Sequence, residues 1–295
     1  MKVLKTPEER FQNIPDYPFK PNFISISNDL EMHYVDEGKG EIILLLHGEP
    51  SWSYLYRKMI PILVNAGFRV IAPDLIGFGK SDKPTEDSDY SYENHVKWLT
   101  NFMVKMELKN IHLFCQDWGG LLGLFIVAHH QELFKSIIAA NTILPMSGSS
   151  TPQIFKTWKE FALNSPTFEA GFIVQNATTT QLTDAEVAAY NAPFPTEEYK
   201  VGSRIFPTLV PFGDNDPYNM IPKCNKAWEK LKTFEKPFLT LFSDSDPIMN
   251  GLEKVFQKLV FGAQYQPHEI MKNGGHFLQE DNYEALCEAI INFLK

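Results

Sequence analysis

The stretch Ile111-His-Leu-Phe-Cys-Gln-Asp-Trp-Gly-Gly-Leu-Leu-Gly123 decides the fold class of this 295-residue chain. An apolar run of strand length leads into a short turn, and an apolar run of helix length follows it. The turn has the pattern of a nucleophile elbow, with Asp117 where esterases carry serine and with Gly119 two residues later. Such a turn holds its central side chain above a sheet. The alternative is that Asp117 only caps the following helix, and the pattern alone favours neither interpretation.

Short β-rich runs alternate with helical patterns on both sides of this stretch. Several runs, such as Ile42–Leu46, are continuously apolar, as expected for strands covered on both faces of a mostly parallel sheet. The expected strands are Phe23–Ser27, Met32–Val35, Ile42–His47, Arg69–Ala72, Ile111–Cys115, Ser136–Asn141, Phe238–Ser243 and His268–Met271. The expected helices are about Tyr54–Ala66, Tyr92–Met106, Gly119–His129, Leu252–Val260 and Tyr283–Leu294. This alternation predicts a doubly wound α/β sheet of about eight strands, with the first two as an antiparallel hairpin at one edge.

The alternation breaks between about Pro145 and Pro222, where the chain is rich in threonine, proline and aromatic residues. Helix-like pieces in this region are Ile154–Ala162 and Asp184–Tyr190, and Thr183-x-x-Glu186 fits a capping box that opens the second piece. We therefore expect one core domain, residues 1–145 and 222–295, with a helical cap, residues 146–221, inserted in it. Such a cap would lie over the carboxyl ends of the strands, where open α/β sheets bind ligands. The alternative is a peripheral decoration with no role at the site.

Composition excludes several classes of protein. Lys and Arg number 27 against 36 Asp and Glu, so the net charge of −9 offers no basic surface for nucleic acid or anionic membrane. The longest apolar run, Leu121–Ala128, is too short to cross a bilayer, and the N-terminus has no apolar signal region, so we expect a cytoplasmic protein. Three widely spaced cysteines predict reduced thiols and neither a disulfide framework nor a zinc or other metal site: Cys115, Cys224 and Cys287.

An aspartate at the elbow changes the chemistry that the turn supports. A serine alkoxide attacks carbonyl carbon, whereas the carboxylate of Asp117 is suited to displacing a leaving group from saturated carbon. The product is an alkyl ester of the protein, which must then be hydrolysed. That step needs a base to activate water, donors for the ester oxyanion and a group that orients the base.

The rest of the chain supplies these groups in the order nucleophile, acid, histidine. Asp246 follows the strand Phe238–Ser243, and it is preferred to Asp244 because it begins the loop proper, while Asp244 can satisfy local backbone groups. His276 lies in the glycine-rich turn Asn273-Gly-Gly-His-Phe277 after the last expected strand. A lone histidine is usually structural, but the combination with Asp117 and Asp246 favours a catalytic role. At the end of another strand, His47-Gly-Glu-Pro50 resembles an oxyanion turn, so the backbone N–H groups of Glu49 and Trp118 are the candidate donors.

Together these motifs resemble the haloalkane dehalogenases, which implies an α/β-hydrolase fold with a cap. The resemblance covers nearly the whole chain and is closest to the subfamily with His-Gly-Glu-Pro in place of His-Gly-Asn-Pro. The segments that carry it are His47–Pro61, Pro73–Pro84, Gln116-Asp-Trp-Gly-Gly120 and Gly275-His-Phe-Leu-Gln-Glu280. It implies that Asp117 is the nucleophile, His276 the base, Asp246 its carboxylate partner, and Glu49 and Trp118 the oxyanion hole.

The resemblance also implies a halide site made of two tryptophans, Trp118 and Trp158. An indole N–H is an uncharged donor, so it can bind the departing halide without pairing with the nucleophile. For Trp158 the alternative, which spacing alone favours, is a core aromatic on an amphipathic cap helix. By the same resemblance five residues line an apolar substrate pocket: Phe155, Pro207, Val210, Ile248 and Met249.

The sequence thus predicts hydrolysis of short haloalkanes to primary alcohol, halide and a proton. We expect a monomer that uses water as its only cosubstrate and needs no cofactor. An epoxide hydrolase is the main alternative, with Tyr190 and Tyr199 of the cap as ring-opening donors. A fluoroacetate-type dehalogenase would need arginines near the elbow, and none follows Asp117. A non-catalytic binding protein of this fold would be expected to lack at least one triad residue.

Overall fold

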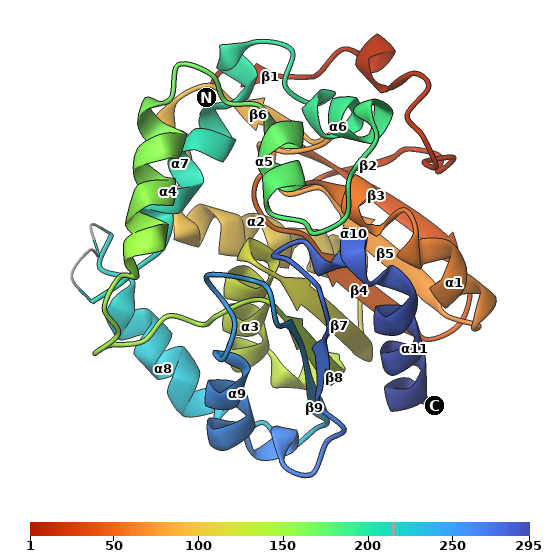
Figure 1. Cartoon of the computed structure of the whole chain (residues 1–295), viewed down its shortest axis with the longest axis vertical. Coiled ribbons are helices and arrows are strands. Elements are labelled where there is room, and N and C mark those ends of the chain that lie inside the picture. Colours follow the sequence, from red (N-terminus) through yellow and green to blue (C-terminus); the bar gives the residue numbers. More distant parts are fainter. Residues whose placement is uncertain (214–215, 217) are drawn as a thin grey trace.

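The computed structural model describes residues 1–213, 216 and 218–295, and an eight-stranded sheet forms its centre (Figure 1). The strand order is β10-β9-β8-β7-β4-β5-β3-β2, in which every neighbouring pair from β10 to β5 is parallel. The pairs β5-β3 and β3-β2 are antiparallel, so the expected edge hairpin is confirmed. The strands are β2 (Asn22–Ser25), β3 (Glu31–Gly38), β4 (Ile42–Leu46), β5 (Arg69–Pro73), β7 (Ile111–Gln116), β8 (Phe134–Ala140), β9 (Phe238–Ser243) and β10 (Glu269–Met271).

Helices cover both faces of this sheet, which explains why its middle strands are apolar throughout. On one face α1 (Met59–Asn65) and α11 (Tyr283–Leu294) pack against β4, β5 and β9 in one hydrophobic cluster. On the other face a larger cluster joins the sheet to four helices: α2 (Tyr92–Lys105), α3 (Trp118–His129), α8 (Ile221–Leu231) and α9 (Glu253–Leu259). Every residue of β7 and β9 is buried, as expected for strands between two layers of helices.

The expected continuous helix Tyr54–Ala66 is wrong. The chain instead forms a 3-10 helix, Ser53–Tyr56, followed after two residues by α1. Pro61 accounts for the break, because it has no N–H to bond the carbonyl of Arg57 and its ring would clash there. A small two-stranded sheet, β1 (Val3–Leu4) with β6 (Lys83–Pro84), was also not expected.

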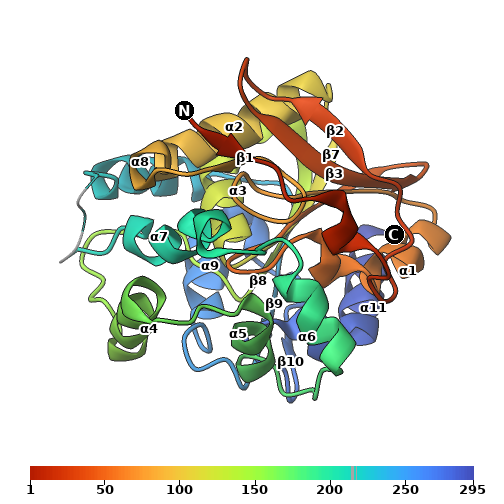
Figure 2. The same cartoon turned by 90° about the horizontal axis from the view of Figure 1, so that it is seen from above.

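Four helices of the expected cap gather on one side of the molecule, as Figures 1 and 2 show. They are α4 (Gln153–Asn164), α5 (Ala170–Asn176), α6 (Asp184–Asn191) and α7 (Val201–Leu209). The predicted capping box is confirmed, since Thr183 Oγ1 accepts from the Glu186 N–H and the Glu186 carboxylate accepts from the Thr183 N–H. The expected cap range 146–221 includes residues 214, 215 and 217, which lie outside the described residues. The division into one core domain, residues 1–145 and 222–295, with the cap inserted in it stays a prediction.

The remaining described elements are short. They are α10 (Leu278–Asp281) and the 3-10 helices Glu8–Phe11, Asp87–Asp89, Gln131–Leu133, Glu197–Tyr199 and Phe261–Ala263. Cys115, Cys224 and Cys287 are buried and unpaired. Over the described ranges, no helix has the length and apolar character needed to cross a membrane.

Candidate active site

Asp117 lies in a strained turn between β7 and α3. Its backbone angles are φ 49° and ψ −126°, a conformation that a non-glycine residue adopts only when its surroundings impose it. Backbone and side-chain bonds hold it there, because its N–H donates to Asn141 O at 3.1 Å and its carbonyl accepts from Thr142 Oγ1 at 2.7 Å. The side chain makes no capping hydrogen bond to α3, so the helix-cap alternative is wrong.

Two glycines make room for this turn. A Cβ at Gly119 would lie 2.1 Å from the carbonyl oxygen of Leu46, so helix α3 could not approach β4 as closely with any other residue. A Cβ at Gly48 would lie 2.1 Å from Asp117 Oδ1. The backbone of the His47–Pro50 turn therefore reaches the carboxylate only because residue 48 has no side chain.

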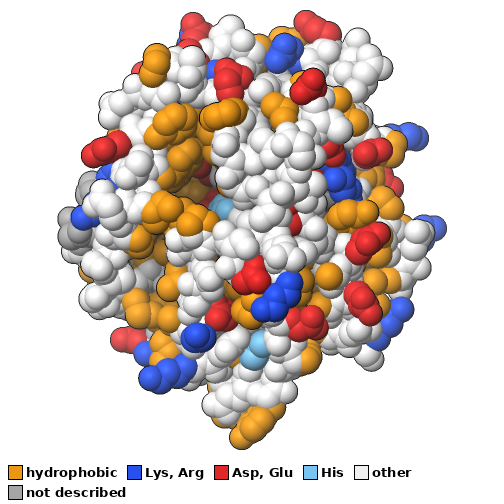
Figure 3. All heavy atoms as spheres, viewed as in Figure 1, with side chains coloured by type: hydrophobic (Ala, Val, Ile, Leu, Met, Phe, Trp, Pro, Cys, Tyr) orange, Lys and Arg blue, Asp and Glu red, His pale blue; other side chains and the backbone are white. Residues whose placement is uncertain are grey.

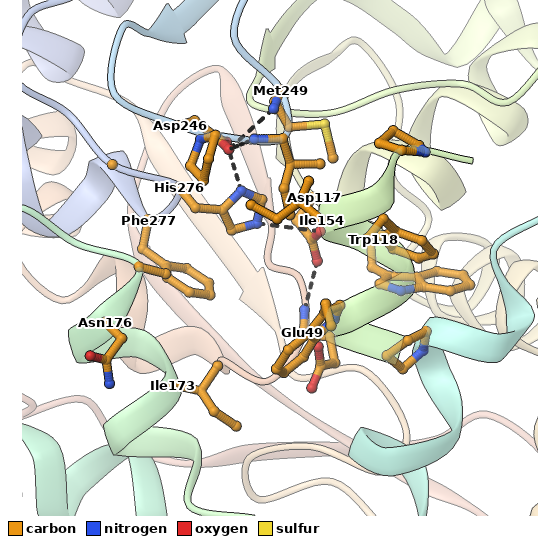
Figure 4. Close-up of a pocket in the computed structure, with 18 of the residues that line it drawn as sticks. Glu49, Asp117, Trp118, Ile154, Ile173, Asn176, Asp246, Met249, His276 and Phe277 are labelled. Carbon is orange, nitrogen blue, oxygen red and sulfur yellow. Dashed lines mark hydrogen bonds and ion pairs between the residues drawn. The ribbon is translucent and has the colours of Figure 1, made fainter. Parts of the chain in front are cut away.

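The structure brings the expected histidine and acid to the same place (Figure 4). His276 Nδ1 lies 2.7 Å from Asp246 Oδ2, and His276 Nε2 lies 3.4 Å from Asp117 Oδ2. The other oxygen of Asp246 accepts backbone N–H bonds from Ile248 and Met249 at 2.8 and 3.1 Å. These bonds fix the carboxylate at the end of β9 and aim it at the ring.

Asp244, the carboxylate that the sequence ranked second, is placed elsewhere. Its Oδ1 accepts from the Asn273 N–H at 2.8 Å and from Ser245 Oγ at 2.9 Å, and its Oδ2 lies 3.7 Å from Lys272 Nζ. It satisfies local groups, as expected, and has no contact with His276.

Opposite charges set the protonation of the histidine and its partner. Burial lowers the pKa of His276, but the carboxylates of Asp246 and Asp117 outweigh burial and raise it to about 10. Burial raises the pKa of Asp246, yet the histidine and the two backbone donors hold this pKa below its ordinary value. The neighbouring aspartates therefore favour the protonated form of the ring in the free site.

One expected oxyanion donor is already bonded to Asp117. The Glu49 N–H donates to Asp117 Oδ1 at 2.8 Å. The N–H of Trp118, the second expected donor, belongs to the first residue of α3, where helix N–H groups have no partner within the helix. Burial and the neighbouring Asp117 charge raise the pKa of the Glu49 side chain well above its ordinary value, with His276 opposing them. Burial and the charge of Asp117 therefore both favour the neutral form of the Glu49 side chain.

A cavity of about 530 Å³ opens above these groups, between the cap and the core. Its walls are mostly hydrophobic, and Asp117, Asp246 and His276 lie at its polar end together with Glu49. Figure 3 shows a hollow on this face with hydrophobic side chains around its rim. Three of the residues that line the cavity are exposed hydrophobic residues: Ile154, Phe161 and Phe172. The five pocket residues that the resemblance indicated all line it: Phe155, Pro207, Val210, Ile248 and Met249.

Both tryptophans of the expected halide site, Trp118 and Trp158, also line this cavity. Within the described part of the chain, neither indole N–H has a hydrogen-bond acceptor. The indoles of Trp52 and Trp228, in contrast, donate to backbone carbonyls of Ala189 at 3.2 Å and Leu144 at 2.8 Å. The two cavity tryptophans are therefore free to donate to a ligand. Trp158 is half-buried and stacks on Phe161 with ring centroids 5.8 Å apart.

The two tyrosines of the epoxide hydrolase alternative do not line the cavity. Tyr190 is fully buried, and its hydroxyl donates to the carboxylate of Glu280. That carboxylate also forms a buried ion pair with Arg57, whose second carboxylate partner is Glu186 of α6. Tyr190 is thus part of a network that joins the cap to the core, and it has no free hydroxyl for a substrate.

Sequence reasoning missed Asn141, which holds the catalytic segments together. Its Nδ2 donates to Ser243 Oγ at 2.7 Å and to the carbonyls of Gly275 and His276 at 3.0 and 3.1 Å. Its Oδ1 accepts from the Ser243 N–H at 2.9 Å, and its own carbonyl accepts from Asp117. The available signal is an asparagine directly after an apolar run, and the predicted strand Ser136–Asn141 includes it.

A carbonyl of the cap was missed as well. Ala177 O accepts from the His276 N–H at 2.7 Å, so the loop after α5 holds the histidine turn in place. A Cβ at Gly275 would lie 2.4 Å from the same oxygen, which accounts for the second glycine of the turn. A backbone acceptor leaves no signature in the identity of its residue, and the sequence offers none here.

The family model described as the alpha/beta hydrolase fold matches residues 41–283. A haloalkane dehalogenase of Psychrobacter cryohalolentis is 47% identical, and the match covers 100% of this chain and 98% of that protein. A haloalkane dehalogenase of Mycolicibacterium paratuberculosis is 45% identical, over 99% of this chain and 98% of that one. Among solved structures, the tetrameric haloalkane dehalogenase DpaA of Paraglaciecola agarilytica is similar at a TM-score of 0.91 and 37% identity, over 99% of each chain.

Proposed function

The chain belongs to the haloalkane dehalogenases of the α/β-hydrolase fold, and from this membership we propose how its residues carry out hydrolytic dehalogenation. Asp117 is the nucleophile, His276 is the base and Asp246 orients that base. The observation that carries the assignment is the pair of contacts on one imidazole, 2.7 Å from Nδ1 to Asp246 and 3.4 Å from Nε2 to Asp117.

The first step is displacement at saturated carbon. Asp117 Oδ1 is held by the Glu49 N–H, so Oδ2 is the oxygen that attacks the carbon bearing the halogen. A carbon–oxygen bond forms, the carbon–halogen bond breaks, and the halide leaves with the electron pair. Halide is a weak base, so this step requires no general acid. The products are an alkyl ester on Asp117 and a halide ion.

The indole N–H groups of Trp118 and Trp158 hold that halide. Both line the same mostly apolar cavity, where a hydrogen bond to an anion is stronger than in water. Indoles carry no charge, so they stabilise the departing halide without pairing with the nucleophile beforehand.

The second step hydrolyses the ester. After the ring has released its own proton to solvent, His276 Nε2 takes a proton from water, and the hydroxide attacks Cγ of Asp117. The oxyanion forms on Oδ1, which the Glu49 N–H already holds, and the Trp118 N–H is its second proposed donor. Collapse of the intermediate breaks the bond between Cγ and the alkyl oxygen. The hydroxyl proton of the intermediate passes to that oxygen, so the alcohol leaves and the aspartate is restored. The balance is one water consumed, with alcohol, halide and one proton released.

The cavity suits a neutral, apolar substrate. At about 530 Å³ it lies in the range that holds drug-sized ligands, so its size does not restrict the substrate to short haloalkanes. The described residues of its lining include no lysine or arginine, and a carboxylated substrate would find no cationic partner there.

A single substitution separates the two steps. In His276→Phe, a brominated alkane should still alkylate Asp117, but the ester should persist. Intact-protein mass spectrometry should show a gain equal to the alkyl group, and peptide mapping should locate it on Asp117. His130→Phe, at a partly exposed histidine away from the cavity, should turn over normally and carry no adduct. An unmodified His276→Phe protein, in a preparation whose wild type turns over, would contradict the mechanism.

All of these residues come from one chain, so a monomer is sufficient for the proposed chemistry. A solved relative is nevertheless described as tetrameric. Light scattering coupled to size exclusion, with activity measured on the separated fractions, tests the proposal. Loss of activity on dilution to monomer would contradict it.

A further inference from the structure

Gln116, the last residue of β7, touches the catalytic base directly. Its side-chain nitrogen lies 3.2 Å from His276 Nε2 and 3.2 Å from the backbone carbonyl oxygen of His276. The side chain is fully buried, and its Oε1 has no hydrogen-bond partner. A buried amide with an unpaired oxygen costs free energy, so this placement calls for an explanation.

The carbonyl of His276 fixes which end of the amide faces the ring. A carbonyl oxygen only accepts hydrogen bonds, so the NH₂ group, and not Oε1, must lie against it. The second amide hydrogen then points at Nε2. This arrangement favours an unprotonated Nε2, because a hydrogen on that nitrogen would face the amide hydrogen.

The charged groups around the ring act in the opposite direction. Asp117, Asp246 and Glu49 are the titratable groups that face it from the core. On the side of the cap, the backbone N–H of His276 donates to the carbonyl of Ala177. The described cap residues that line the cavity include no charged side chain. In the free enzyme the two carboxylates therefore keep the ring protonated. Once Asp117 is an ester, one of those charges is gone, and the ring must lose its proton before it can act as a base.

We propose that Gln116 is a positioning residue that holds His276 as the neutral tautomer, with its proton on Nδ1, while the ester on Asp117 awaits water. The Nδ1 proton then faces Asp246 Oδ2, and Nε2 keeps its lone pair for water. The contact to Nε2 is long, so water can displace it, while the bond from the amide to the carbonyl of His276 keeps Gln116 in place. This inference rests on the proposed function, since it assigns Gln116 to the second step only.

The test measures the pKa and the tautomer of the His276 ring after the charge of Asp117 has been removed, and it does not depend on turnover. Asp117→Ala imitates the uncharged ester without adding a donor. Nitrogen-15 NMR of labelled histidine then gives the pKa and tautomer of His276 in Asp117→Ala and in Asp117→Ala with Gln116→Met. Loss of one hydrogen bond to the neutral ring should raise this pKa by about one. Gln116→Glu, which replaces the donor by an acceptor, should raise it further and serves where Gln116→Met does not fold.

Gln279 provides the matched control. It is a second fully buried glutamine, three residues after His276, and it has no hydrogen bond to the catalytic side chains among the described residues. Gln279→Met in the Asp117→Ala background should leave the His276 pKa unchanged. A pKa that is equal with and without Gln116, or that shifts equally in the Gln279 variant, would overturn the proposal.

Single-turnover kinetics give the second readout. In Gln116→Met with Asp117 intact, alkylation should keep its rate, while the acid limb of ester hydrolysis should move to higher pH by about one. Hydrolysis at neutral pH then falls up to about tenfold and recovers at high pH. A loss of rate that is equal at every pH would indicate a structural role only and would also overturn the proposal. Failure to form any ester would instead contradict the proposed function.

Discussion

Arg57 of the core and Glu280 form a fully buried ion pair four residues beyond His276, with Arg57 Nη2 3.0 Å from Glu280 Oε2. Glu186 and Tyr190 of the cap helix α6 join the same pair. The segment that carries the base is therefore tied to the cap through charges that have almost no access to water.

Glu280→Ala should lower the free energy of unfolding by about 3 kcal/mol, because it leaves the Arg57 charge buried with one carboxylate partner fewer. Urea unfolding followed by fluorescence measures this loss. The matched control is Glu93→Ala, which breaks the exposed pair with Lys223 and should cost less than about 1 kcal/mol. If both variants lost the same free energy of unfolding, burial of the pair between Arg57 and Glu280 would not increase its contribution to stability.

The pH dependence of unfolding should report His276. Burial lowers its pKa, but Asp246 and Asp117 raise it to about 10, above the ordinary value of 6.5. A protonated group with a raised folded-state pKa stabilises the native state fully below about pH 6.5, and this contribution is lost as pH rises through about 10. His276→Phe should therefore lose less stability than wild type between these limits, measured by urea titration at several pH values. Parallel pH profiles for the two proteins would contradict the assigned charges.

The core was predictable from local sequence because burial leaves a strong pattern. The run Ile42–Leu46 is apolar at every position since helices cover both faces of the sheet, and the last helix, Tyr283–Leu294, has the observed bounds. The elbow pattern around Asp117 was visible as well, because small residues must surround so tight a turn, but the pattern alone did not separate a nucleophile from a helix cap.

What the sequence did not show depends on contacts between distant segments. Arg57 lies 223 residues from Glu280, and Asn141 lies 102 residues from Ser243. Neither pairing has a local pattern, and a surface charge or a strand-end asparagine would look the same in the sequence. Pro61 indicates the break between Ser53–Tyr56 and α1. The apolar periodicity around this proline nevertheless predicted one continuous helix.

Gly48→Ala tests how closely the oxyanion turn must approach the nucleophile. The new Cβ would lie 2.1 Å from Asp117 Oδ1, so either the carboxylate or the turn must move. A displacement of that size should lower the alkylation rate by about a hundredfold, measured as the halide burst in a single turnover.

Gly67→Ala is the control, because its φ of 100° strains an alanine while nothing lies within 4 Å of the added Cβ. It should cost about 1 kcal/mol of stability and leave the burst rate unchanged. A normal burst in Gly48→Ala would show that the close approach is not needed.

Trp158→Phe tests whether the cap supplies one of the two halide donors. The indole of Trp158 lines the cavity and has no acceptor among the described residues, so replacing it removes a donor and leaves an aromatic wall in place. Loss of one hydrogen bond to an anion is worth about 1.5–3 kcal/mol, which is about a 10- to 150-fold weaker affinity for bromide. Quenching of the remaining tryptophans by titrated bromide measures the dissociation constant.

Trp228→Phe is the matched control, because its indole already donates to Leu144 O at 2.8 Å and it does not line the cavity. That variant should lose stability and keep wild-type bromide affinity. Unchanged affinity in Trp158→Phe would exclude it from the halide site and leave Trp118 as the donor there.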